Sequence, residues 1–105
     1  MYKIYCDGAS RSNPGEASIG VSIQNNEQEV DTIAKKIGVA TNNVAEYEGL
    51  RTALDYCDKN NLKDVQIYLD SLLVVQQVNG KYKVKSQNLK DLYNLCTDLI
   101  EKRTY

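Results

Sequence analysis

The sequence predicts an α/β fold in which helices cover a mixed sheet. Apolar and polar side chains alternate through much of the first forty residues, as they do in half-buried strands. From residue 43 the apolar spacing changes to that of an amphipathic helix. A short apolar strand and two more helical segments follow. The predicted order, βββαβαα, is typical of a sheet with helices packed on it.

Three strands open the chain. Alternation over residues 2–7 predicts the first strand, and Asn13-Pro14-Gly15 marks a loop after it. Alternation resumes over residues 17–23 and predicts the second strand. Asn25-Asn26 then predicts a turn into a third strand at about residues 30–37. Two hairpin-style connections make these three strands antiparallel.

The remaining elements alternate between helix and strand. A helix from Asn43 carries an apolar stripe of Val44, Tyr47, Leu50, Leu54 and Cys57. Val65–Leu69 predicts a short strand, and Leu72–Val78 predicts a second helix closed by Gly80. A third helix carries the stripe Leu89, Leu92, Cys96, Leu99 and Ile100.

Composition predicts one domain over residues 1–105. The chain is 42% hydrophobic and 26% charged, as a small globular domain is. No stretch reaches the roughly 18 apolar residues that a membrane span needs, and no signal pattern opens the chain. We therefore expect a cytoplasmic protein without a membrane partner. Cys6, Cys57 and Cys96 lie among apolar neighbours, which predicts buried thiols in a reducing compartment.

The net charge of −1 argues against a protein that coats nucleic acid nonspecifically. Any contact with a polyanion must then be local. Residues 80–86 are the best local candidate, because three lysines alternate there with Tyr82 and Val84. The same segment also fits a plain connector in which Gly80 ends one helix, Ser86 caps the next and the lysines are solvated.

Three acidic residues stand at the ends of different predicted elements. Asp7 closes a strand, Glu46 opens a helix and Asp70 closes another strand. Carboxylates that gather at one point form a site for a hard cation, because Mg²⁺ prefers oxygen ligands. This pattern predicts metal-assisted phosphoryl chemistry.

Each carboxylate also has a structural interpretation. Glu46 lies three residues after Asn43 and could complete a capping box. Asp7 could be an exposed residue entering a turn, helped by Gly8. Asp70 could be the N-cap of the helix that follows it.

The segments around these acids carry a family resemblance. They read Asp7-Gly8-Ala9-Ser10, Thr41-Asn42-Asn43-Val44-Ala45-Glu46-Tyr47 and Tyr68-Leu69-Asp70-Ser71. In this order and spacing they resemble ribonuclease H of type 1, which cuts the RNA strand of an RNA–DNA hybrid. The resemblance covers residues 1 to about 103 and is to the compact branch without a basic handle. It implies a ribonuclease H-like fold that lacks the last strand and the C-terminal helix.

The resemblance also implies roles for individual residues. Asp7 would bridge two Mg²⁺ ions, with Mn²⁺ as an alternative, and Glu46 and Asp70 would complete the ligands on the leaving-group side. Four polar residues would contact the RNA strand, namely Ser12, Asn13, Asn42 and Asn43. Thr41 would hold a phosphate of the DNA strand.

The resemblance implies a fourth catalytic aspartate that this sequence does not supply. It therefore implies an endonuclease with weakened activity. The alternative is a catalytically incomplete module that binds nucleic acid or a protein partner. We also expect a homo-oligomer built around the Val65–Leu69 edge or the Leu89–Ile100 helix, because a missing strand would leave that edge unpaired.

Overall fold

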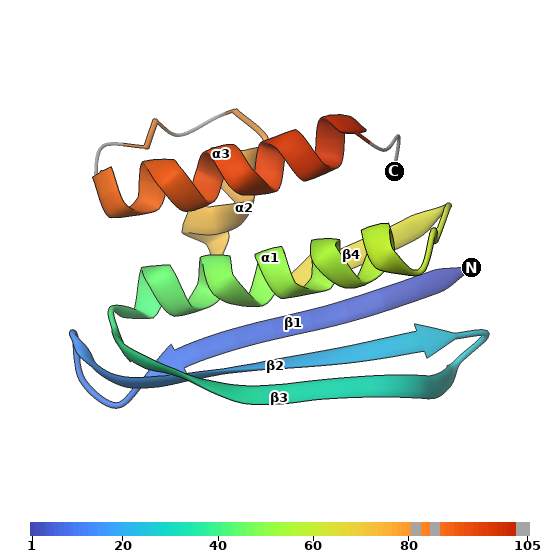
Figure 1. Ribbon diagram of the computed structural model, residues 1–105, viewed down its shortest axis with the longest axis horizontal. Coiled ribbons are helices and arrows are strands. Elements are labelled where there is room, and N and C mark those ends of the chain that lie inside the picture. Colours follow the sequence, from blue (N-terminus) through green and yellow to red (C-terminus); the bar gives the residue numbers. More distant parts are fainter. Residues whose placement is uncertain (81–82, 85–86, 103–105) are drawn as a thin grey trace.

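The computed structural model describes residues 1–80, 83–84 and 87–102. Within these residues, four strands and three helices follow one another in the predicted order (Figure 1). They are β1 (Tyr2–Ser10), β2 (Gly15–Asn25), β3 (Gln28–Ala40), α1 (Asn42–Lys59), β4 (Val65–Leu69), α2 (Leu72–Val78) and α3 (Gln87–Lys102). The third strand is longer at both ends than the sequence pattern predicted.

The strands form one sheet with the order β3-β2-β1-β4. β1 pairs antiparallel with β2, β2 pairs antiparallel with β3, and β1 pairs parallel with β4. The three antiparallel strands are therefore confirmed. β1 lies between β2 and β4, so its carboxyl end and that of β4 meet at the same edge of the sheet.

The helices form two further layers on one face of the sheet. α1 lies across the sheet, and α3 packs on the side of α1 that faces away from the strands (Figure 1). The strand residues that face α1 are apolar and buried, and they include Ile4, Cys6, Val21 and Ile23. A second apolar cluster joins α1 to α2 and α3 and includes Tyr47, Leu50, Leu54, Val74, Leu89 and Cys96.

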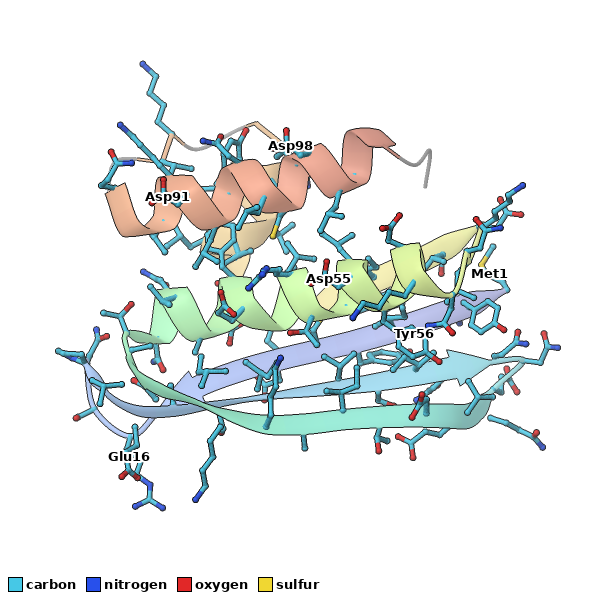
Figure 2. All side chains as sticks on the ribbon, in the orientation of Figure 1. Met1, Glu16, Asp55, Tyr56, Asp91 and Asp98 are labelled. Carbon is cyan, nitrogen blue, oxygen red and sulfur yellow. The ribbon has the colours of Figure 1, made fainter. Side chains whose placement is uncertain are left out.

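The opposite face of the sheet carries polar and aromatic side chains. Glu16 projects from this face, away from α1 (Figure 2). Tyr5 and Tyr68 stack there with ring centroids 4.9 Å apart. Because residues alternate between the two faces of a strand, Asp7 shares this outer face with Tyr5.

The three thiols are buried, as predicted, and they form no disulfide. Burial raises the pKa of Cys6 and of Cys96 to about 12, so both remain protonated at neutral pH. Within the part of the chain that the structure describes, no helix is long and apolar enough to cross a bilayer.

The segment after α2 is described only in part. Gly80 follows the C-cap residue Asn79 with φ +82°, a left-handed conformation that glycine adopts easily at a helix end. The predicted end of this helix is therefore confirmed. The predicted cap at Ser86 lies outside the described residues.

Candidate active site

Asp7 lies inside β1 rather than at its end. It pairs with Gly20 of β2, and β1 continues to Ser10. The expectation that Asp7 closes its strand and enters a turn is wrong, because residues 8–10 stay extended and pair with residues 17–19. Asp7 is exposed on the outer face of the sheet.

Two glycines bring the Asp7 segment against α1. A β-carbon on Gly8 would lie only 2.1 Å from the carbonyl oxygen of Ala45 and 2.7 Å from the backbone nitrogen of Glu46. A β-carbon on Gly49 would lie 3.1 Å from the carbonyl oxygen of Asp7. Because glycine has no β-carbon, the two backbones can approach closely enough to place Asp7 beside Glu46.

The helix caps exclude two structural interpretations. The N-cap of α1 is Thr41, whose hydroxyl accepts a hydrogen bond from the backbone N–H of Val44 at 3.2 Å. Glu46 is too far along the helix to complete a capping box with Thr41. The N-cap of α2 is Ser71, whose hydroxyl accepts from the backbone N–H of Val74 at 3.3 Å, so Asp70 does not cap this helix.

Glu46 is the electrostatic centre of the site. Burial raises the pKa of its carboxyl from 4.5 to about 7, and the negative charge of Asp7 adds to the rise. A hydrogen bond from the Gly8 backbone acts in the opposite direction, whereas a hydrogen bond with Asp7 and the charge of Asp70 raise this pKa further. Asp7 and Asp70 thus both raise the pKa of Glu46.

The polar residues predicted to bind substrate gather where the β1–β2 loop meets the start of α1. The backbone N–H of Asn42 donates to Oδ1 of Asn13 at 3.2 Å, and Oδ1 of Asn42 accepts from the backbone N–H of Ser10 at 2.8 Å. The Ser12 hydroxyl donates to the Pro14 carbonyl oxygen at 2.8 Å. The structure therefore brings the loop and the Thr41–Asn43 segment together.

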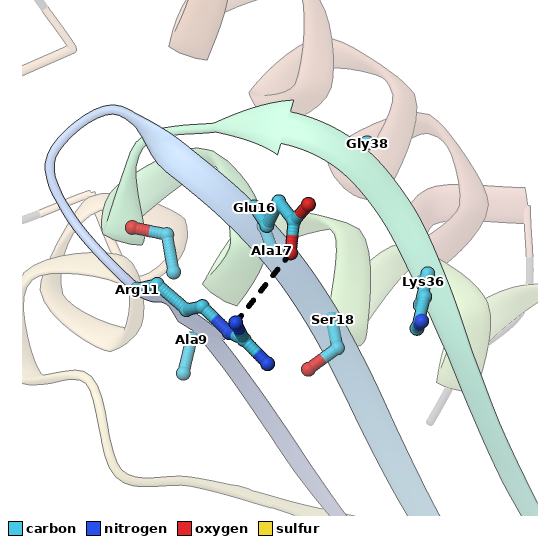
Figure 3. Close-up of a pocket in the computed structure, with 8 residues that line it drawn as sticks. Ala9, Arg11, Glu16, Ala17, Ser18, Lys36 and Gly38 are labelled. Carbon is cyan, nitrogen blue, oxygen red and sulfur yellow. Dashed lines mark ion pairs between the residues drawn. The ribbon is translucent and has the colours of Figure 1, made fainter.

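Sequence reasoning missed a hollow on the outer face of the sheet. It has a volume of about 330 Å³, and Ala9, Arg11, Glu16, Ser18 and Lys36 are among the residues that line it (Figure 3). Arg11 and Glu16 form an exposed ion pair there at 3.8 Å. The hollow depends on strand register, which pairs Ala9 with Ser18 and Ser18 with Lys36. No local sequence pattern reports this register.

Comparison with known proteins matches this arrangement to one family. The family described as reverse transcriptase-like matches residues 5–105. The N-terminal RNase H domain of a Mycobacterium tuberculosis protein is 38% identical, with a TM-score of 0.91 over 97% of this chain and 79% of that chain. RNase H1 of Halobacterium salinarum is 32% identical, with a TM-score of 0.92 over 98% of this chain and 79% of that chain.

A third solved structure contains nucleic acid. LC11-RNase H1 in complex with an RNA/DNA hybrid is 38% identical, with a TM-score of 0.91 over 98% of this chain and 78% of that chain. The curated relatives are longer proteins. The chain spans 25% of a bifunctional protein of M. tuberculosis, at 42% identity, and 44% of ribonuclease HI of H. salinarum, at 38% identity.

The chain therefore belongs to the reverse transcriptase-like family and has the fold of ribonuclease H. This confirms the resemblance and the predicted fold class.

The oxygen donors around Glu46 are of the chemical type that suits a hard divalent cation. Carboxylate oxygens are the ligands that Mg²⁺ prefers, and Oε2 of Glu46 is buried without a hydrogen-bond partner. As the side chains stand, no three His, Cys, Asp or Glu groups within residues 1–80, 83–84 and 87–102 converge enough to hold an ion.

Proposed function

We propose that the chain is a divalent-metal-dependent endonuclease that hydrolyses the RNA strand of RNA–DNA hybrids. The observation that carries the proposal is Glu46, whose buried oxygen has no partner and whose pKa is raised by burial and by Asp7 and Asp70. Perturbed carboxylates of this kind cluster at functional sites. The family membership and the hybrid-bound relative support the substrate class.

In this proposal Asp7, Glu46 and Asp70 hold Mg²⁺ or Mn²⁺. A pair of such ions, when bound, activates the attacking water and stabilises the departing 3′ oxygen, which leaves 5′-phosphate and 3′-hydroxyl ends. Asp7 would hold an ion together with the other two carboxylates, because it lies between the elements that carry them. Its strand touches α1 through Gly8 and pairs with β4, which Asp70 follows.

The polar cluster at the start of α1 would contact the hybrid. Oδ1 of Asn42 is held by Ser10, so its amide nitrogen is the group left to meet the RNA strand, together with Asn43, Ser12 and Asn13. The Thr41 hydroxyl already accepts a hydrogen bond, and its own proton can be donated to a phosphate oxygen of the DNA strand. A 2′-hydroxyl offers both a donor and an acceptor to such short side chains.

We expect the activity to depend on all three carboxylates of this chain, because loss of a group that positions the reacting atoms costs orders of magnitude in rate.

Cleavage of an RNA–DNA hybrid labelled on the RNA strand tests the proposal. We expect Mg²⁺- or Mn²⁺-dependent cleavage that is lost in Asp7→Asn. Binding of the hybrid without cleavage would favour the alternative, a module that binds nucleic acid or a partner and does not cut. Cleavage that continues unchanged in Asp70→Asn would show that the assigned site is wrong.

We also propose that copies of this chain associate with one another in the cytoplasm. β4 lies at the end of the described sheet, and its edge adjoins a groove of about 260 Å³ lined by apolar side chains that include Ile67, Leu69, Val78 and Ile100. On α3, Leu95 is 46% exposed. Light scattering should show an oligomer as concentration rises, with slower amide exchange over Val65–Leu69. A monomer at high concentration would contradict this part.

A further inference from the structure

One buried polar pair lies within the apolar cluster between the helices. Tyr47 of α1 is fully buried, and its hydroxyl donates a hydrogen bond to Oε1 of Gln77 in α2 at 2.6 Å. Gln77 is itself only 4% exposed. A buried polar group that loses its partner is costly, so this pair favours one arrangement of the two helices.

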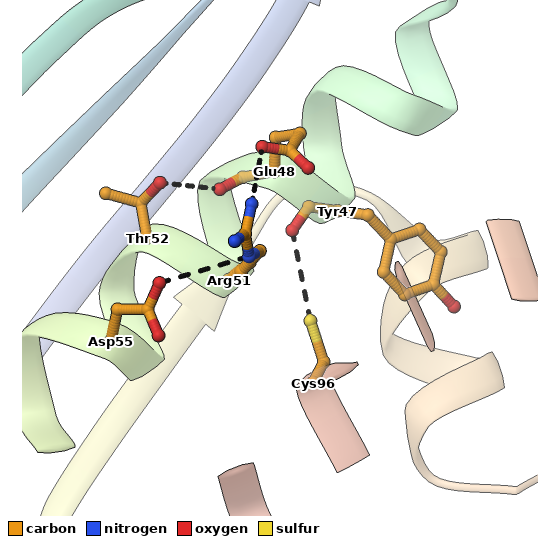
Figure 4. A network of polar contacts seen from close by, with 6 residues as sticks. All are labelled: Tyr47, Glu48, Arg51, Thr52, Asp55 and Cys96. Atoms are coloured by element: carbon orange, nitrogen blue, oxygen red, sulfur yellow. Dashed lines mark hydrogen bonds and ion pairs between the residues drawn. The ribbon is translucent and has the colours of Figure 1, made fainter. Parts of the chain in front are cut away.

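Both ends of the pair are anchored beyond it. Nε2 of Gln77 donates to the backbone carbonyl of Lys83 at 3.3 Å, which fixes the orientation of its amide. The backbone carbonyl of Tyr47 accepts a long contact from the thiol of Cys96 in α3 at 4.0 Å (Figure 4). Tyr47 therefore links α1 to both other helices.

The pair joins the two helices that stand beside the carboxylates of the proposed site. Tyr47 follows Glu46 directly in α1, so the rotation of α1 that places the Tyr47 ring also sets the direction in which the Cα–Cβ bond of Glu46 leaves the helix. Gln77 belongs to α2, which starts from the Asp70-Ser71 pair. At seven residues, α2 is too short to hold its own position without packing.

We infer that Tyr47 and Gln77 are positioning residues, whose hydrogen bond sets Asp70 against Glu46 and thereby the affinity of the site for a divalent cation. This inference rests on the proposed function. The surrounding apolar contacts hold α1 and α2 together without direction, whereas a short hydrogen bond fixes both distance and angle. Ligand groups need placement within about 0.5 Å, which directionless packing does not supply.

The test compares Tyr47→Phe with Tyr56→Phe. Both variants lose one phenolic hydroxyl from α1, but Tyr56 bonds to Asp31 and not to α2. Calorimetric titration with Mg²⁺ should show an increase of about tenfold in the dissociation constant for Tyr47→Phe, the lower range for loss of a group that orients metal ligands. Tyr56→Phe should bind Mg²⁺ as the unmodified chain does.

A double variant separates positioning from stability. Tyr47→Phe with Gln77→Leu replaces both partners with apolar groups, which restores much of the stability lost when one partner stands alone. We expect its thermal midpoint to recover while its Mg²⁺ affinity stays low. This comparison also serves if the single variant folds poorly.

Three outcomes would overturn the inference. Unchanged Mg²⁺ affinity in Tyr47→Phe would show that the bond does not position the carboxylates. Recovery of affinity together with stability in the double variant would show that the pair acts only on stability. If the unmodified chain binds no Mg²⁺, the proposed metal site itself fails and this inference falls with it; in the first two outcomes the proposed function stands.

Discussion

Replacement of Gly8 by alanine is the sharpest perturbation of the site that leaves every carboxylate in place. The added β-carbon would lie 2.1 Å from the Ala45 carbonyl oxygen, where ordinary contact begins at 3.4 Å. β1 and α1 must then separate by about 1 Å. The obstructing atoms belong to the backbone and cannot rotate away, so we expect the upper range for overpacking, about 3 kcal/mol of unfolding free energy.

Thermal and urea unfolding would measure this loss. For a domain of this size, about 3 kcal/mol lowers the melting temperature by roughly 12–24 °C. Gly20→Ala is the matched control, because Gly20 lies in the neighbouring strand and a β-carbon there meets nothing within 4 Å. We expect the control to change stability by less than about 0.5 kcal/mol. Equal stability of the two variants would refute the close approach of β1 and α1.

Three further predictions concern charge and helix ends. The fold raises the Glu46 pKa from 4.5 to about 7, so folding favours the protonated carboxyl. With a metal chelator present, the free energy of unfolding should therefore fall by about 1–2 kcal/mol as the pH rises from 4.5 to 7, after allowance for solvent screening. Glu46→Gln should remove this slope, and an unchanged slope would contradict the assignment. Ser71→Ala and Thr41→Ala should each cost about 1 kcal/mol in urea unfolding; no loss would mean that neither hydroxyl caps its helix. Lys36 lines the outer-face hollow together with Ser10 and Arg11, next to the loop that we propose contacts the hybrid. If the hybrid backbone extends over this hollow, Lys36→Gln should lower the salt dependence of hybrid binding by about one unit, and Lys90→Gln on α3 should not. Equal slopes for the two variants would exclude the hollow from the interface.

The fold was predictable because its elements carry strong local signals. Alternation around Ile4 and Ile23 predicts one buried face for the strands, and the stripe through Tyr47 and Leu54 predicts one buried face for the first helix. The structure confirms that these residues are buried. The bounds of Leu72–Val78 are confirmed because Ser71 and Gly80 mark its ends chemically. The end of β1 was misplaced because an Asp-Gly pair signals a turn in isolation, whereas pairing with β2 keeps it extended.

The sequence predicted the candidate site only as a list of residues. Which side chains meet depends on backbone approaches that no local pattern reports, such as Gly8 against Ala45. The Tyr47–Gln77 pair was missed for a related reason. Tyr47 occupies a position on the apolar stripe, and the polar partner that its hydroxyl needs lies 30 residues away in another helix.

Calorimetric titration with Mg²⁺ and Mn²⁺ tests the central claim, that Asp7, Glu46 and Asp70 form one divalent-cation site. We predict binding that strengthens as pH rises from 6 to 8, since Glu46 must lose its proton to become a ligand. Binding should be lost in Asp7→Asn, Glu46→Gln and Asp70→Asn. It should persist in Asp98→Asn, whose side chain is exposed on the side of α3 away from α1 (Figure 2). Ion binding that is equally strong in Asp7→Asn and in the unmodified chain would contradict the account.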